Sequence, residues 1–470
     1  MIPMLIDDDR LFPAEKMTRA VARRLYDEVR DLPIISPHGH TDPAWYAQDE
    51  PFPDPATLFI VPDHYVFRML YSQGVGLEEL GVQPQTGEAI AFDPRAVWRT
   101  FAGHYHLFRG TPTRIWLDHV FATLFGFKER LSPANADDYF DRISAALQTP
   151  ELRPRALFQR FGIEAIATTD SPLDSLEHHQ ALRRSGWNGK VVPTYRPDPV
   201  VDPEFEGFAD NLRRLGEITG CETLSWAGYL DAHRQRRAAF KALGATATDH
   251  GHPTAATADL ERSDAEALFQ RIVADRFDPE DAELFRGQML TEFAAMSLDD
   301  GLVMQLHPMG GRNHNAALFR RFGRNMGADI PTRTDYVAGL KPLLDRFGNE
   351  RGLTLILFTL DEATYGRELA PLAGHYPCLR LGPPWWFFDS PEGMRRFREL
   401  TTETAGFYNT VGFNDDTRAY LSIPARHDVA RRADCGYLAE LVATHRLDED
   451  EACEVARDLA YGLAKAAYRL

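Results

Sequence analysis

A His-X-His motif, His38-Gly39-His40, follows a short apolar run that begins at Leu32. Because alternate residues of a strand point to the same side, the two imidazoles are expected to converge on one point, with Gly39 leaving room between them. Such a pair suits one divalent metal bound through nitrogen. An isolated motif of this kind often arises by chance, but at the end of a buried strand it indicates a metal site.

Other ionisable residues end further apolar runs. Asp416 is the expected third metal ligand, with Asp415 as the alternative, because strand alternation points only one of the two inward. His307 ends another run and is interpreted either as a ligand for metal or substrate or as a structural histidine. The segment Asp249-His-Gly-His252 contains a second His-X-His pair, but Pro253 breaks this run. We expect no second metal there, and expect one or both histidines to face the pocket.

Eight apolar runs would position these side chains, and helical segments separate them. The alternation predicts parallel βαβ units, and eight of them predict a (β/α)₈ barrel of the metal-dependent hydrolase kind. The alternative, an open doubly wound sheet, lacks support because the chain has no GxGxxG or GxxxxGK[ST] loop. In barrel enzymes the active site lies at the carboxyl ends of the strands. The runs are residues 32–40, 163–170, 190–196, 244–250, 301–307, 353–361, 378–382 and 410–416.

The interval between the first two runs is too long for a loop, since such connections are usually about 2–6 residues. We therefore predict that residues 43–160 form an inserted, mainly helical domain after the first strand. The barrel with its helical extensions would comprise residues 1–42 and 161–470. Amphipathic helices are expected at 437–445 and 448–470, the latter with Asp448 and Glu451 forming a capping box.

Composition excludes several classes of protein. The formal net charge of −17 argues against nucleic-acid partners and against an anionic membrane surface. No apolar stretch approaches the roughly 20 residues of a transmembrane helix, and the N-terminal segment MIPMLIDDDR does not resemble a signal peptide. The four cysteines have no CxxC spacing, so we expect small core residues in a reducing, cytoplasmic location.

Taken together, a series of motifs resembles the uronate isomerase family of the amidohydrolase superfamily. The resemblance extends from near residue 10 to near residue 440, with the motifs in the same order. The departures from the family pattern are Tyr for Trp at 195 and Thr for Ser at 248 and 417. The motifs are His38-Gly-His40, Asp63-His64-Tyr65, Tyr195-Arg-Pro-Asp198, Thr248-Asp-His-Gly251, Met304-Gln-Leu-His307, Arg312-Asn-His-Asn315, Trp385-Trp-Phe387 and Asp416-Thr-Arg418.

The resemblance implies interconversion of D-glucuronate with D-fructuronate and of D-galacturonate with D-tagaturonate. It implies one divalent metal, expected to be zinc, held by His38, His40 and Asp416, and we expect a homo-oligomer. Such a reaction opens the sugar ring and moves hydrogen from C2 to C1. The expected catalytic residues are Tyr65, Asp416, His307 and His64, and the expected substrate-binding residues are Arg196, Arg312, Arg418, Trp385, Trp386 and His250.

Asp416 could also handle the hydroxyl proton during ring opening. Tyr65 is the candidate for the C2 proton, but a tyrosine pKa near 10 is too high for an easy base. We therefore expect a cationic neighbour, His64 or Arg68, to lower the pKa of Tyr65.

Two other functions use the same motifs. A metal-dependent hydrolase on this barrel would employ the same histidines and aspartate to activate water. The chain lacks the strand-four lysine that bridges two metals in such enzymes, and it has Tyr65 and the arginines instead. A non-catalytic sugar-acid binding protein would be expected to have lost a metal ligand, and none is missing.

Overall fold

Parallel strands form the centre of the molecule in the computed structural model, which describes residues 5–470. The first four residues, part of the segment that argued against a signal peptide, lie outside this range. The strands pair in the orders β1-β2-β3 and β4-β5-β6-β7, and every pairing is parallel. Their bounds are β1 Ile34–Ser36, β2 Ile163–Ala167, β3 Lys190–Val192, β4 Ala247–His250, β5 Val303–Leu306, β6 Leu355–Leu357 and β7 Leu379–Leu381.

Backbone hydrogen bonds outside the regular strands close the barrel. The amide of Tyr195 donates to Ala247 O at 3.3 Å and joins β3 to β4. An extended segment from residue 409 to 417 takes the eighth place: Val411 N donates to Leu381 O at 3.0 Å, and His40 N donates to Thr417 O at 3.0 Å. Seven parallel strands, an extended eighth segment and the helices between them confirm the predicted (β/α)₈ class.

The expectation of a regular eighth strand was wrong. Gly412 has φ of +75° and Asp416 has φ of +37°, and a ladder cannot continue through left-handed residues. Gly412 also lies so close to Leu459 O that an added Cβ would be 2.7 Å from it. The close approach of the C-terminal helices therefore bends this segment away from strand geometry.

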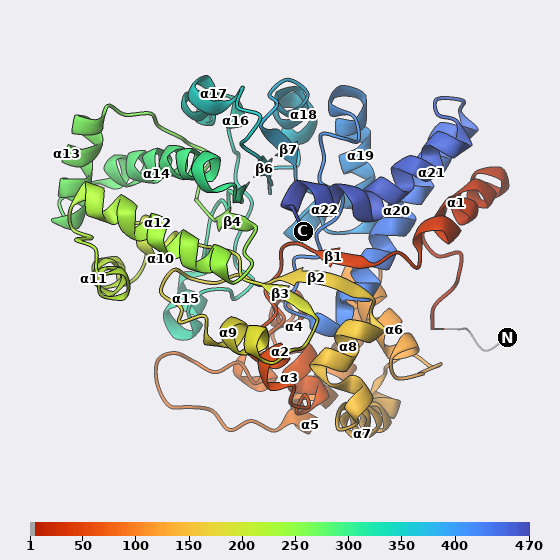
Figure 1. The fold of residues 1–470 in the computed structure, drawn as a ribbon. Coiled ribbons are helices and arrows are strands. Elements are labelled where there is room, and N and C mark those ends of the chain that lie inside the picture. Colours follow the sequence, from red (N-terminus) through yellow and green to blue (C-terminus); the bar gives the residue numbers. More distant parts are fainter. Residues whose placement is uncertain (1–4) are drawn as a thin grey trace.

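Helices alternate with the strands and pack around them. Figure 1 shows α11–α14 on one side of the strands and α16–α19 along the top. A large hydrophobic cluster lies between the strands and these helices, with Leu306, Leu355 and Leu381 on its strand side. The helices are α9 Glu177–Arg184, α10 Asp198–Val201, α11 Phe208–Thr219, α12 Trp226–Ala242, α13 Arg262–Val273, α14 Pro279–Asp300, α15 Ala316–Phe322, α16 Tyr336–Gly339, α17 Lys341–Phe347, α18 Ala370–Ala373 and α19 Pro391–Ala405.

The segment between β1 and β2 is helical. Its hydrophobic cluster contains Phe59, Trp98 and Ile143, and the same cluster includes Ile34 of β1 and Ile166 of β2. The insertion therefore shares its core with the barrel, and its boundary at 43–160 stays a prediction. Its helices are α2 Pro43–Gln48, α3 Pro55–Phe59, α4 His64–Tyr71, α5 Pro94–His104, α6 Pro112–Thr123, α7 Ala136–Leu147 and α8 Pro154–Arg160.

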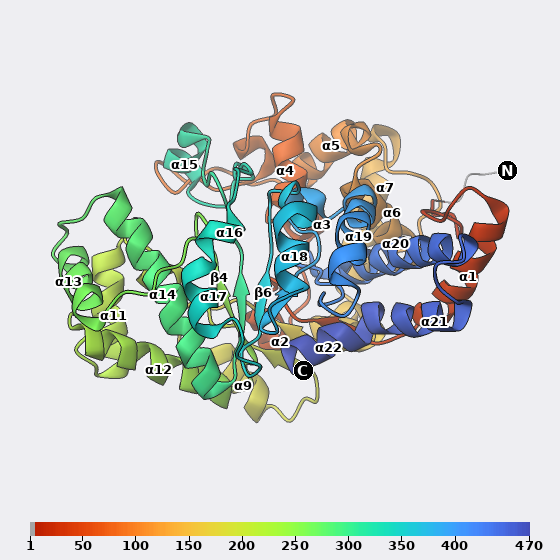
Figure 2. The same ribbon diagram turned by 90° about the horizontal axis from the view of Figure 1, so that it is seen from above.

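Helices from the two ends of the chain form an extension beside the barrel, on the right in Figures 1 and 2. Leu25 and Val29 of α1 pack against Leu438 of α20. The predicted capping box of Asp448 and Glu451 begins α21. Near the C-terminus, Tyr468 enters the barrel interior and donates to Gln305 Oε1 at 2.9 Å. The helices of the extension are α1 Lys16–Val29, α20 Ile423–Ala443 and α21 Glu449–Arg457, and α22 Leu463–Tyr468 lies next to the strands.

None of the helices that the structure describes is long and apolar enough to cross a membrane.

Replacing Leu357 by Ala tests the packing of β6. The side chain is fully buried in the cluster between strands and helices. Leu357→Ala should lower the free energy of unfolding by about 2–5 kcal/mol, because it leaves a cavity in close-packed surroundings. Urea denaturation measures this loss. Leu400→Ala, at a residue of α19 that is 41% exposed, is the control and should change stability by about 0.5 kcal/mol or less; equal losses would contradict the assigned core.

Candidate active site

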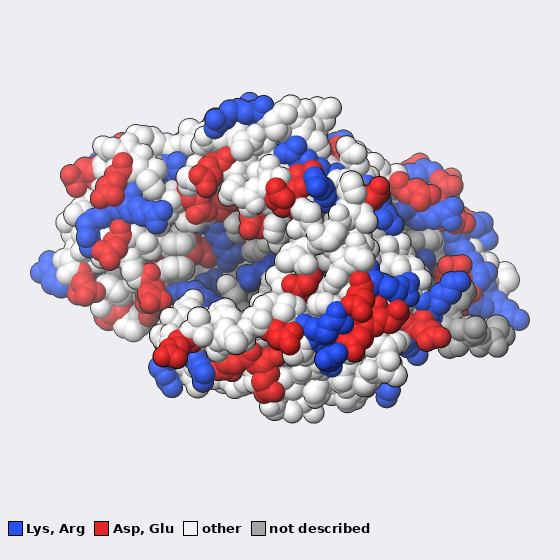
Figure 3. Space-filling view, turned by 90° about the horizontal axis from the view of Figure 1, so that it is seen from below, with Lys and Arg blue, Asp and Glu red and all other residues white. Residues whose placement is uncertain are grey.

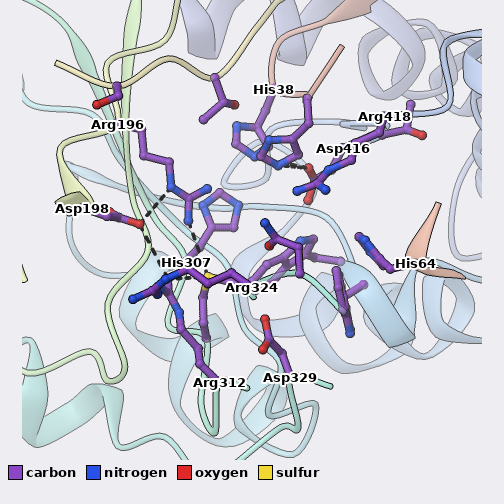
Figure 4. A pocket seen from close by; sticks show the side chains of 18 of the residues that line it. His38, His64, Arg196, Asp198, His307, Arg312, Arg324, Asp329, Asp416 and Arg418 are labelled. Atoms are coloured by element: carbon purple, nitrogen blue, oxygen red, sulfur yellow. Dashed lines mark hydrogen bonds and ion pairs between the residues drawn. The ribbon is translucent and has the colours of Figure 1, made fainter. Parts of the chain in front are cut away.

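The predicted site residues surround one cavity of about 370 Å³ that lies beyond the carboxyl ends of the strands. Every one of them lines it except His250. Figure 4 shows these side chains converging from the barrel and from the insertion. Additional lining comes from the segment after β5, which supplies Arg324 and Asp329. In Figure 2 this segment, with α15, lies on the same side of the barrel as α4 and α5 of the insertion.

One group of side chains has the composition of a metal site. Ligand atoms of His38, His307 and Asp416 all lie within 4.8 Å of one another. Asp416 Oδ1 is 3.1 Å from His40 Nε2 and 3.4 Å from His38 Nε2. Ligands bound at about 2.1 Å with tetrahedral angles lie about 3.4 Å apart, so the two distances to Asp416 fit one ion. The group within 4.8 Å contains His307 in place of the predicted ligand His40. Asp416 rather than Asp415 faces the histidines, since Asp415 Oδ2 turns to His427 Nε2 at 3.1 Å.

His307 is prepared to offer a lone pair toward this group. Its Nδ1 is 2.6 Å from Asp249 Oδ1, while its buried Nε2 has no hydrogen-bond partner among the described residues. A carboxylate that accepts from one ring nitrogen fixes the tautomer and leaves the other nitrogen free for a metal. Asp416 Oδ1 is also buried without a hydrogen bond. His307 Nε2 and Asp416 Oδ1 both offer lone pairs, so they fit the role of ligands to a divalent cation better than they fit a hydrogen bond to each other.

The charges of the group favour an ionised carboxylate. Burial raises the pKa of Asp416, but His38 and His40 outweigh this effect and hold the pKa well below its ordinary value. Burial lowers the pKa of His40 to about 4, so this imidazole is neutral at pH 7. Burial also lowers the pKa of His38, but Asp416 and Asp249 outweigh this effect and raise it above its ordinary value. Neutral imidazole and ionised carboxylate are the forms that bind metals.

Arginines and acids alternate along another wall of the cavity. Arg196 donates through Nε to Asp198 Oδ2 at 2.9 Å and through Nη1 to Asp249 Oδ2 at 2.8 Å. Arg312 Nη2 lies 3.7 Å from Asp198 Oδ2 and donates to Gly251 O. Burial raises the pKa of Asp198, but Arg196 and Arg312 outweigh this effect and lower the pKa to about 2. Burial lowers the pKa of Arg312, whereas burial of Arg196 is outweighed by Asp198 and Asp249, which raise its pKa. Both guanidinium groups stay charged, since arginine is not deprotonated in proteins, and can bind an anion.

Arg418 also lines the cavity, and Figure 4 shows it beside Asp416. Figure 3 shows a hollow with Lys or Arg side chains at its floor, on a face where charges of both signs are mixed. The cavity lining contains groups of both signs: Arg196, Arg312, Arg324 and Arg418 lie among the aspartates Asp63, Asp170, Asp174, Asp198, Asp329 and Asp416.

Aromatic side chains form the wall next to the insertion. Trp386 stacks on His64 with ring centroids 4.1 Å apart, and Trp385 meets His307 edge to face at 4.8 Å. Both tryptophans therefore line the cavity. The rings of Tyr65 and His64 lie 4.8 Å apart, and neither ring nitrogen of His64 has a hydrogen-bond partner among the described residues.

The expectation that His64 or Arg68 lowers the pKa of Tyr65 is not met. Burial raises the pKa of Tyr65 well above its ordinary value, and the cation that opposes this effect is Arg426. Burial and the nearby Arg418 lower the pKa of His64 well below its ordinary value, so His64 carries no charge at pH 7. Tyr65 is consequently a phenol and His64 a neutral imidazole.

The structure places His250 away from the cavity. Its Nε2 lies 3.0 Å from Thr248 Oγ1, and its ring packs 4.9 Å from that of Phe293 in α14. A substrate contact by His250 is therefore not supported. Strand alternation in β4 points Asp249 inward and His250 outward, and our sequence reasoning chose the wrong residue of this pair. Ala247 faces the barrel interior, so strand alternation also points Asp249 inward, and this signal could have identified Asp249.

Two residues of the cavity wall have strained backbones. Asp416 has φ of +37° and Trp386 has φ of +56°. Non-glycine residues in such conformations cost about 1–3 kcal/mol each and persist only where their surroundings hold them. The metal-site carboxylate and the aromatic wall are thus positioned at the expense of local stability.

Gly251 packs where the arginines converge, and its replacement tests their role. A Cβ at this position would lie 2.2 Å from Arg196 Nη2 and 2.5 Å from Arg312 Nη2. Gly251→Ala should therefore displace both guanidinium groups and raise KM for an anionic sugar about 10-fold or more. Steady-state kinetics measures the change. Gly103→Ala is the control, because an added Cβ there meets no atom within 4 Å; an unchanged KM in Gly251→Ala would contradict the assignment.

Comparison with known proteins identifies close relatives over the full chain. The family model of glucuronate isomerase matches residues 11–468. A uronate isomerase of Phenylobacterium zucineum is 68% identical over 468 residues, which cover 100% of this chain and 97% of the relative. One of Mesorhizobium japonicum is 67% identical over 466 residues, covering 99% of each chain.

Solved structures agree. The crystal structure of glucuronate isomerase from Caulobacter crescentus is 62% identical, with a TM-score of 0.98 over 99% of this chain and 97% of that one. The uronate isomerase of Thermotoga maritima is 27% identical, with a TM-score of 0.91 over 98% of this chain and 99% of that one.

Proposed function

The chain belongs to the glucuronate isomerase family, and we propose that its cavity interconverts D-glucuronate with D-fructuronate and D-galacturonate with D-tagaturonate. Membership of this family makes the chain an aldose–ketose isomerase. The observation that carries the substrate proposal is the joint presence, around one cavity, of a metal-ligand group, several charged arginines and a phenol–imidazole pair. A cytoplasmic location and a homo-oligomeric state stay predictions.

We propose that His38, His40 and Asp416 hold one zinc ion, with His307 as a further ligand or as a partner of the substrate. Two or three imidazoles with one carboxylate are a ligand set that zinc prefers. When bound, the ion would attract the carboxylate and a neighbouring hydroxyl of the sugar and polarise them. The low pKa of Asp416 keeps its carboxylate ionised, so it is in the form that can accept a hydroxyl proton as the ring opens.

The arginines would fix the anionic, hydroxyl-rich substrate. Arg196 is held by Asp198 and Asp249, so its guanidinium is oriented before the sugar enters. Arg312 and Arg418 can contribute forked hydrogen bonds to carboxylate or hydroxyl oxygens. Such preorganisation reduces the entropy lost on binding. Trp385 and Trp386 would cover the carbon chain and exclude water from the reacting end.

We propose that His64 and Tyr65 move the protons between C2 and C1. The neutral imidazole of His64 accepts the C2 proton while the phenol of Tyr65 donates its proton to the C1 carbonyl oxygen, which gives an enediol. The imidazolium then returns a proton to C1, and the phenolate recovers a proton from the C2 hydroxyl as the ketone forms. This division of roles uses each group in the protonation state that its burial favours.

Metal content tests the proposed ligands. Protein loaded with zinc should contain about one ion per chain. Asp416→Asn and His38→Gln should each lose most of the zinc, because a site with so few protein ligands tolerates few losses. Inductively coupled plasma mass spectrometry after gel filtration gives the stoichiometry. Asp329→Asn, which alters an acid elsewhere on the cavity wall, should keep its metal, and equal metal content in all variants would sink the assignment.

Isomerisation in heavy water tests the proton transfer. Proton NMR should record conversion of D-glucuronate to D-fructuronate with solvent deuterium at C1, because an imidazolium proton exchanges with water between the two transfers. Complete absence of deuterium over many turnovers would indicate a hydride shift and remove the proposed role of His64. Hydrolysis of an ester or lactone without conversion of any hexuronate would instead favour the hydrolase alternative.

Substitutions can separate effects on substrate binding from effects on proton transfer. Tyr65→Phe should lower kcat about 100-fold or more with little change in KM, because the hydroxyl acts mainly in the transition state. Tyr71→Phe, an exposed tyrosine at the end of the same helix, should leave both constants unchanged. Unlike Tyr65→Phe, Arg418→Lys should also raise KM, since a lysine cannot reproduce a forked contact. Similar kcat values in Tyr65→Phe and Tyr71→Phe would contradict the proposal.

A further inference from the structure

Arg426 of α20 is 1% exposed and lies beneath the active site. Its Nη1 donates to Asp389 Oδ2 at 2.6 Å, and its Nε donates to Ser422 Oγ at 3.1 Å. Its guanidinium carbon lies 3.5 Å from the ring centroid of Trp116. A buried guanidinium with this many partners has one well-defined position, so it can fix the position of whatever contacts it.

Trp116, the first partner considered, belongs to the insertion. Trp116 of α6 meets Tyr65 of α4 edge to face, with centroids 5.9 Å apart. The guanidinium carbon of Arg426 is itself 5.4 Å from the Tyr65 centroid. A desolvated cation against aromatic faces attracts both rings. Arg426 therefore helps to set the position of the phenol that reaches the cavity.

The second partner belongs to the loop after β7. Asp389 follows the turn Trp386–Phe388 and is 4% exposed. Its Oδ1 has no hydrogen-bond partner among the described residues. Burial raises the pKa of Asp389 to about 7, and Arg426 is the cation that pairs with it and opposes this effect. The ion pair thus fixes the end of the turn that carries the aromatic wall.

The third partner is the extended segment in the eighth position. Arg426 Nη1 lies 3.5 Å from the carbonyl oxygen of Asp415, the residue before Asp416. Asp416 has a left-handed backbone that its surroundings must maintain. A cation at the preceding carbonyl stabilises the peptide orientation from which Asp416 turns toward the histidines.

We propose that Arg426 is a positioning residue that aligns the phenol of Tyr65, the Trp386 wall and the Asp416 carboxylate with one another. The three come from the insertion, from the loop after β7 and from the segment after residue 409, and Arg426 contacts all three segments without lining the cavity. The part of the inference that concerns turnover rests on the proposed isomerase function. The part that concerns alignment rests on these contacts alone.

Arg237 is a matched control. It is fully buried in α12 and pairs with Asp300 and Ser297, and none of the three lines the cavity. The test compares Arg426→Met, Arg426→Lys and Asp389→Asn with Arg237→Met in the full chain, each loaded with zinc. Kinetics with D-glucuronate gives kcat and KM, and hydrogen–deuterium exchange with mass spectrometry reports on residues 62–71, 385–390 and 412–418.

Arg426→Met should lower kcat about 100-fold with a much smaller change in KM, because displacements of about 1 Å cost that much in rate. Exchange should increase together in all three segments. Arg426→Lys should recover part of kcat, since a cation remains near Asp389 and the rings, and Asp389→Asn should resemble Arg426→Met. Arg237→Met should lose thermal stability but keep kcat and the exchange of the three segments.

A kcat in the Arg426 variants equal to that of Arg237→Met, or increased exchange confined to α20, would overturn the proposal. If Arg426→Met does not fold, Arg426→Lys and Asp389→Asn decide by the same two measurements. If the wild-type protein itself converts no hexuronate, the proposed function fails, and exchange in the three segments then decides the alignment separately.

Discussion

Asp249 is fully buried at the end of β4, where one carboxylate oxygen lies 2.6 Å from His307 Nδ1 and the other accepts from Arg196 at 2.8 Å. Charges taken out of water cost several kcal/mol each unless partners compensate them. Asp249 compensates the charge of Arg196, which therefore stays charged in a water-poor cavity. Asp249 also holds His307 through Nδ1, so that His307 presents its free nitrogen toward His38 and Asp416. Arg196 on one wall of the cavity and His307 beside His38 and Asp416 therefore depend on the same carboxylate.

The insertion is a structural part of the site rather than an accessory. Its hydrophobic cluster continues into β1 and β2, and its helix α4 supplies His64 and Tyr65. Trp386, from the barrel, stacks on His64. Removing the insertion would therefore uncover the first strands of the barrel and remove the part of the cavity wall that His64 and Tyr65 form.

Most of the barrel and most of the site could be predicted because hydrophobic runs and motif order carry that information. Seven strands lie where the runs place them, whereas the eighth segment is irregular because helices distant in sequence crowd Gly412. The predicted helix at 437–445 is the end of α20, which begins at Ile423; its buried Arg and Asp residues conceal the apolar periodicity. Choosing Asp249 over His250, and finding Arg426 under Tyr65, required three-dimensional contacts that one sequence does not encode locally.

The barrel closes where the amide of His40 donates to the carbonyl of Thr417. This contact joins segments separated by most of the chain, and so does the approach of His38 and His40 to Asp416. Contacts of such high sequence separation form late, since the entropy of closing a long loop must be lost before they are gained. A ribosome-bound chain therefore cannot bring His38 and His40 to Asp416 until nearly the whole polypeptide has emerged. Assembly of this group then coincides with completion of the barrel, so an unfinished chain lacks the proposed ion site as well as the closed fold.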